Sequence, residues 1–269
     1  LLLGLAAWIF LNRVYVVDQL TVWRFKPSAD IESVAEQSSM SDRGKFLFYA
    51  SIPAIESRDT FNTHCTTDAE KTAILGCYAA RKIYIYDVTD SRLTGVKEVT
   101  AAHEMLHAAY DRLSDAERTR VNGLIDQATQ SGTNESIAKR LALYAKTEPG
   151  ERYNELHSIL GSEIKDLPAD LEKYYGQYFV NRLTVVSLSE RYEAVFNELE
   201  THQNTLVREL NALADLINKG SDSYNQKFTS LQSAILAFNQ RAARGDFSSQ
   251  SAFNAERSRL LAQQSDLND

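Results

Sequence analysis

The stretch from Val96 to Leu113 contains neither glycine nor proline and is rich in alanine and leucine, so it is predicted to form a helix. Within it, His103, Glu104 and His107 form the pattern His-Glu-x-x-His. Residues four apart lie on the same face of a helix, so both imidazole rings are expected to point the same way. One metal ion can bind both rings, and Glu104 can act as a base toward a water molecule that the metal activates.

The composition is that of a globular, helix-rich protein. Of the 269 residues, 43% are apolar and 24% are charged, which is ordinary for a folded domain. The chain has only 11 glycines and 4 prolines, which favours helix. The net charge is −7 and the sequence has no basic stripe, so binding to nucleic acid is not expected.

The chain has 2 cysteines, Cys65 and Cys77, which flank a polar stretch. Their closeness predicts a disulfide bond in an oxidising compartment, with two buried free thiols as the alternative. Neither cysteine belongs to a C-x-x-C pair, so zinc binding by cysteine is not expected. His64, next to Cys65, is interpreted as a solvated loop histidine.

Residues 1–11 are continuously apolar, and Trp8 with the polar pair Asn12 and Arg13 is typical of the end of a membrane helix. A spanning helix needs about 20 apolar residues, but this run begins at the first residue of the sequence. We therefore interpret residues 1–17 as the distal part of a membrane anchor or uncleaved signal sequence, with a buried helix or strand as the alternative. Together with the cysteines, this predicts a membrane-anchored protein whose main domain is extracytoplasmic.

Hydrophobic patterns outline the remaining secondary structure. Alternating isoleucine and tyrosine predict a strand over residues 82–88, directly before the motif helix. A second strand is predicted over residues 45–52, and residues 57–68 are predicted to form a loop. Further helices are predicted over residues 31–37, 114–129, 135–146, 151–160 and 167–179, the second of them opened by a capping box at Ser114 and Glu117.

The motif helix and the strand before it resemble the active site of the zincin metallopeptidases. The resemblance implies a zinc ion, a protein or peptide substrate, and pairing of that substrate with residues 82–88 as an edge strand. An inner strand is the alternative for this segment. One zincin branch has a third histidine in H-E-x-x-H-x-x-G-x-x-H, but Ala108 to Leu113 contain neither glycine nor histidine. The other branch, the gluzincins, takes its third ligand from a glutamate on a downstream helix.

Glu155 is the preferred third zinc ligand, because Asn154-Glu155 resembles the start of the ligand helix in thermolysin-like enzymes. The alternatives are His157, Glu151, Glu163 and Glu135. Many gluzincins carry an aspartate four residues after the ligand, which holds the first zinc histidine, whereas this chain has Ile159. Glu151 or Glu163 is expected to take that role instead.

His157 is also a candidate catalytic residue. If Glu155 binds the metal, His157 is expected to line the cleft and stabilise an oxyanion, as a histidine or tyrosine does in related enzymes. Tyr174, Tyr175 and Tyr178 offer the same chemistry, although a row of tyrosines on a helix is more often part of the core.

The C-terminal third has a heptad-like pattern. Leucine and isoleucine recur at spacings of three, four or seven from Leu199 to Ile217, and a similar apolar row follows from Tyr224 to Ala242. Gly220 separates the two rows, which predicts two long helices in an antiparallel hairpin, with self-association as the alternative. A second break is predicted at Gly245, before a last helix over residues 252–264.

These observations predict an α+β fold with a small zincin-like sheet, an active-site helix, a mostly helical remainder, and a C-terminal long-helix hairpin or coiled coil. The expected domains are an anchor (1–17), a catalytic domain (18–185) and a helical arm (186–269). The expected function is peptide-bond hydrolysis by a membrane-anchored zinc metallopeptidase, with Zn²⁺ on His103, His107 and Glu155 and with Glu104 as the base. The alternatives are a non-catalytic envelope protein with a structural or vestigial zinc site and a partner-binding arm, and a zinc hydrolase of a non-peptide bond.

Overall fold

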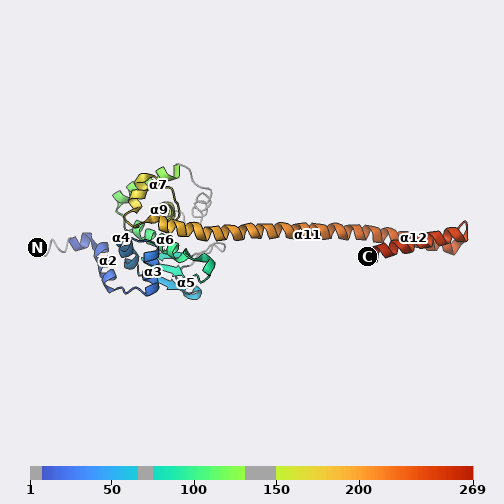
Figure 1. The fold of residues 1–269 in the computed structure, drawn as a ribbon, viewed down its shortest axis with the longest axis horizontal. Helices are drawn as coiled ribbons and strands as arrows, with labels where there is room; N and C mark the ends of the chain where they lie inside the picture. The colour runs from blue at the N-terminus through green and yellow to red at the C-terminus, as the bar shows by residue number, and fades with distance from the viewer. Residues whose placement is uncertain (1–7, 66–74, 131–149, 269) are drawn as a thin grey trace. The chain divides into compact units, whose positions relative to one another are not determined.

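A computed structural model describes residues 8–65, 75–130 and 150–268 of the chain (Figure 1). The chain divides into two units, residues 1–197 and residues 198–269. Over the described residues, helices predominate beside one three-stranded sheet, and a long helix lies toward the C-terminus. This confirms the predicted α+β class.

The helices of the first unit are short or of medium length, and several are capped by side chains. Ser28 accepts a hydrogen bond from the backbone N–H of Ile31 at the start of α3, and Ser114 and Glu117 form the predicted capping box at the start of α7. The helices are α2 (Arg13–Arg24), α3 (Ala29–Gln37), α4 (Asp42–Ala50), α5 (Arg58–His64), α6 (Val96–Asp111), α7 (Asp115–Gln130), α9 (Arg152–Ser162), α10 (Ala169–Tyr175) and the first part of α11 (Arg182–Arg244).

The sheet consists of β1 (Ala54–Glu56), β2 (Gly76–Ala79) and β3 (Lys82–Tyr86), in the order β1-β3-β2. β1 runs parallel to β3, and β2 runs antiparallel to it. The strand predicted over residues 82–88 is therefore the central strand, and its assignment as an edge strand is wrong. The edge strand beside the motif helix is β2.

The core of the first unit is built around α6. Its residues Ala101, Ala102, Met105 and Leu106 are fully buried, and they pack against the sheet and α9. Gly161 of α9 lies against α6 so closely that an added Cβ atom would be 2.4 Å from Leu106 Cδ1. A side chain at this position would therefore force Leu106 and Tyr175 to shift.

Two of the predicted segments differ from the structure. Residues 45–52 were expected to form a strand but belong mainly to α4, where Gly44, Leu47 and Phe48 are buried at helical spacing below the Ser41 N-cap. The loop expected over residues 57–68 contains α5. The helix expected over residues 135–146 lies outside the described residues.

The membrane anchor is also corrected. Over the part of the chain that the structure describes, no helix has the length and apolar character needed to cross a membrane, so the prediction of a membrane-anchored protein is wrong on these residues. The helix that follows the apolar run, α2, instead belongs to the folded domain. Its Asp18 is only 3% exposed and forms ion pairs with Arg112, at 2.7 Å, and with Arg81, at 3.1 Å.

The second unit contains the rest of α11 and the final helix α12 (Gln250–Asn268). α11 passes through Gly220 without interruption, so the break predicted there is wrong. A single glycine costs an exposed helix only about 1 kcal/mol, which the rest of a long helix offsets. The chain turns at Gly245, where φ is +76°, and Leu231 and Phe238 of α11 are buried together with Leu260 of α12.

Candidate metal centre

Helix α6 presents the three motif residues. The rings of His103 and His107 have their centroids 4.8 Å apart and meet edge to face. Their side chains are 15% and 9% exposed, so both are largely buried but remain in contact with solvent. Glu104 lies between them in sequence and is buried.

Helix α9 supplies the third candidate ligand. Glu155 Oε1 is 3.4 Å from His107 Nε2, and Glu155 Oε2 is 3.8 Å from His103 Nε2. One ligand atom from each of the three residues lies within 4.8 Å of the others. In a tetrahedral zinc site with bonds of about 2.0–2.2 Å, the ligand atoms lie about 3.4 Å from one another. The cluster therefore fits a metal ion after a small contraction.

The donor set is chemically suitable for zinc. Two imidazole nitrogens and one carboxylate oxygen make up the protein ligands of many catalytic zinc sites, and they leave a fourth position for water or substrate. Imidazole also suits copper, iron and nickel, so these donors could hold a metal ion but are not specific for zinc.

A second layer of polar side chains orients the histidines. Asn154 Oδ1 lies 2.9 Å from His107 Nδ1, while Asn154 Nδ2 donates to Glu151 Oε2 at 3.0 Å. Because the amide of Asn154 already donates through its nitrogen, its oxygen accepts the proton of His107 Nδ1. This leaves the lone pair of His107 Nε2 directed toward Glu155, as metal binding requires.

His103 is held by a different acidic residue. Glu163 Oε1 lies 3.5 Å from His103 Nδ1, so Glu163 occupies the role that the sequence left open between Glu151 and Glu163. Ile159, at the position of the gluzincin aspartate, is buried in the core. Glu135, another candidate ligand, lies outside the described residues.

The charge around His103 favours a cation. Burial alone would lower the pKa of this imidazole, but the carboxylates of Glu155, Glu163 and Glu104 outweigh burial and raise it to about 10. The same carboxylates would stabilise a metal ion at this point.

Glu104 lies against the edge strand. An added Cβ atom at Gly76 of β2 would be 2.9 Å from Glu104 Oε1 and 2.4 Å from Thr100 Cγ2. Only glycine at this position lets the strand lie so close to α6. Gly76 was not among the functional residues predicted from the sequence, where its position directly before Cys77 was the available signal.

His157 is enclosed in the core. It is fully buried, with Nε2 2.9 Å from the hydroxyl of Tyr174 and with its backbone carbonyl accepting from Tyr175. Burial, and then the neighbouring imidazoles of His107 and His103, lower its pKa to about 3, so the ring is neutral. The ring of His157 is not accessible to a substrate in this structure, so we do not propose it as a residue that stabilises an oxyanion.

The predicted disulfide bond between Cys65 and Cys77 is present, and it joins the end of α5 to the edge strand β2. His64 is not simply solvated. Its Nδ1 lies 2.9 Å from Glu56 Oε2, and its ring stacks on Tyr84. These contacts support the sheet at β1 and β3. Among the described residues, His64 and Glu56 are not joined by a third side chain that could complete a metal site.

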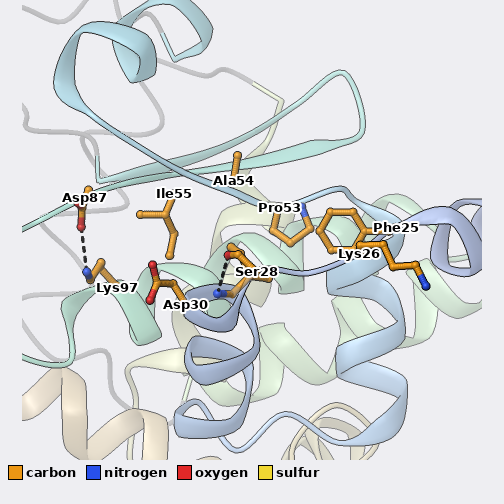
Figure 2. A pocket seen from close by; sticks show the side chains of 10 residues that line it. Phe25, Lys26, Ser28, Asp30, Pro53, Ala54, Ile55, Asp87 and Lys97 are labelled. Atoms are coloured by element: carbon orange, nitrogen blue, oxygen red, sulfur yellow. Dashed lines mark hydrogen bonds and ion pairs between the residues drawn. The ribbon is translucent and has the colours of Figure 1, made fainter.

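A separate hollow of about 370 Å³ lies beside β1 and the start of α3 (Figure 2). Its lining includes Lys26 and Asp30, and Figure 2 shows the ion pair between Asp87 and Lys97, which measures 2.9 Å. None of the motif residues or candidate ligands lines it. The hollow is therefore distinct from the candidate metal centre.

Comparison with known proteins does not assign the chain to a family. No family model matches the chain, and no curated protein or solved structure matches it either.

Proposed function

We propose that this protein is a zinc-dependent hydrolase that cleaves peptide bonds. The observation that carries the proposal is the convergence of His103, His107 and Glu155 from two helices, with the carboxylate of Glu104 next to them in sequence. A purely structural metal site has no need of such a base.

The proposed roles of the residues follow from their positions. A zinc ion bound by the three ligands would polarise a carbonyl group and acidify a water molecule. Glu104 accepts the proton of the attacking water and passes it to the departing amine nitrogen. Asn154 and Glu163 keep the two imidazoles oriented, so that Nε2 of each ring remains the donor.

The edge strand β2 supports a peptide as the substrate. Among the described strands, β2 pairs with β3 alone, and we propose that an extended substrate pairs with its other side. A peptide paired with β2 would add a strand to the sheet and would pass close to Glu104, because Gly76 lies directly over that carboxylate. The backbone recognises the peptide in this arrangement, and side-chain contacts would set its sequence preference.

The direct test is Glu104→Gln, assayed against a mixture of denatured proteins with mass-spectrometric detection of new termini. We expect the variant to retain its zinc and to lose at least about 100-fold in rate, since a positioned base contributes about 10²–10⁴-fold. Glu98→Gln, on the same helix, removes the same charge and is expected to keep the wild-type rate. Undiminished hydrolysis by Glu104→Gln would refute the proposed mechanism. A zinc-loaded wild type that cleaves none of the proteins would favour the non-catalytic alternative.

A further inference from the structure

A row of large apolar side chains is exposed along the middle of α11. Leu206, Leu210, Leu213 and Ile217 follow one another at spacings of four, three and four residues, which places them on one face of the helix. With two flanking residues they form what we call the Leu206–Ile217 stripe, all of it between 48% and 69% exposed: Leu206, Val207, Leu210, Leu213, Leu216 and Ile217.

The same face of α11 is covered further along the helix. Leu231 and Phe238 lie two and three heptads beyond Ile217, and both are buried against α12 through Leu260. Arg241 and Glu256 form an ion pair between the two helices. Among the described residues of the second unit, nothing covers the Leu206–Ile217 stripe in this way, as its exposure shows.

We propose that a second copy of this chain covers the Leu206–Ile217 stripe by packing its own α11 along it. A row of leucine and isoleucine at heptad spacing is complementary to itself, because the side chains of one helix fill the spaces between those of the other. Such a pairing is symmetric, with the same patch used on both copies.

The size of the stripe matches this role. Its six residues leave roughly 600 Å² exposed, the upper end of the apolar patches found on monomers. Complete burial of the stripe on two copies would remove roughly 1,200 Å² from solvent, the area at which specific protein interfaces begin.

Charge also favours a second copy over a lipid surface. Residues 198–228 carry five acidic and three basic side chains, a net charge of −2, with the two signs interspersed. So small a net charge opposes self-pairing only weakly. Helices that lie on membranes have polar faces rich in lysine and arginine, which this segment lacks.

The test is sedimentation equilibrium of the full chain over micromolar concentrations. We expect the wild type to have at least the mass of a dimer. Leu210→Glu with Ile217→Glu places charges in the stripe and is expected to weaken association by at least about 100-fold. Asn211→Glu with Asn218→Glu adds the same charges one position further along, on the polar side, and is expected to associate like the wild type.

A neutral variant and circular dichroism distinguish weaker association from unfolding of α11. Leu210→Gln with Ile217→Gln keeps charge and helix propensity and is expected to weaken association in the same direction, with helix content unchanged. A wild type that stays monomeric, or stripe variants that associate as tightly as the wild type, would overturn the proposal. So would a monomeric wild type that binds vesicles of phosphatidylcholine and phosphatidylserine.

Discussion

Glu163 lies 3.5 Å from Nδ1 of His103, on the opposite side of the ring from the proposed ligand Glu155. The two glutamates are eight residues apart, and each lies near a different ring nitrogen of His103. Glu163 thus orients the imidazole of His103, and Glu155 would face a metal ion bound at the proposed site. The aspartate that many gluzincins use for this purpose is absent here, and Glu163 at the C-terminal end of α9 supplies the same contact.

This pairing predicts the behaviour of Glu163→Gln. Loss of the carboxylate leaves His103 less basic and less well oriented, so zinc affinity is expected to fall about 10–100-fold. Competition with a chelating dye measures the affinity. Asp166→Asn, an exposed acidic residue nearby, is the control and is expected to bind zinc like the wild type. Equal zinc affinity in Glu163→Gln and wild type would show that the contact has no role in metal binding.

Gly76→Ala tests the link between the edge strand and the base. The added methyl group would lie 2.4 Å from Thr100 Cγ2 and 2.9 Å from Glu104 Oε1, so the strand or the carboxylate must move. Displacement by about 1 Å at a reacting centre can reduce a rate by about 100-fold. We therefore expect a large fall in hydrolysis with zinc content unchanged, measured on the same sample. Gly123→Ala meets open space in α7 and is expected to leave the rate unaltered.

Two glycines near the C-terminus predict opposite effects of the same substitution. Gly220→Ala removes a flexible residue from the interior of α11, where an added Cβ meets nothing, and is expected to stabilise the helix by about 1 kcal/mol. Gly245→Ala is expected to destabilise the turn between α11 and α12, because φ of +76° strains any residue with a Cβ atom. Thermal unfolding followed by circular dichroism compares them. A lower unfolding temperature for Gly220→Ala than for wild type would contradict an unbroken helix.

The capping box at the start of α7 predicts a pH effect. Hydrogen bonds from the Ser114 hydroxyl and backbone N–H lower the pKa of the Glu117 carboxyl. The ionised carboxylate therefore stabilises α7 fully at pH values above the ordinary pKa of a glutamate. This stabilisation is lost as the pH falls through the lowered pKa of Glu117. Ser114→Ala removes the hydroxyl bond, so the pKa of Glu117 is expected to rise, as measured by NMR titration of its carboxyl carbon. An unchanged Glu117 pKa in this variant would rule out the hydroxyl as its cause.

The sequence was sufficient where the local pattern and the final environment agree. The helix that carries His103 and His107 follows from its alanine-rich, glycine-free composition, and the capping box at Ser114 follows from spacing alone. The helix predicted over residues 151–160 is present as α9, and it carries Glu155 close to His103 and His107.

Other features depend on contacts between distant segments. The short strand at Gly76 carries no strong alternation of its own and is defined by pairing with β3. Phe46 and Phe48 alternate as in a strand, yet residues 42–50 are helical because burial of Leu47 and Phe48 against the core decides the outcome. His157 shares a helix with Glu155, and its sequence position does not show that it is buried among tyrosines. That burial is visible only in the structure.

The most direct test of the proposed metal centre is the zinc content of the purified chain, measured by elemental analysis after reconstitution. We predict one zinc ion per chain in the wild type and in His202→Ala, which removes an exposed histidine of α11. Less than about one tenth of that amount is predicted for His107→Ala and Glu155→Ala, because each removes one of three protein ligands. A wild type that binds no zinc, or a Glu155→Ala variant that keeps all of it, would contradict the proposed centre.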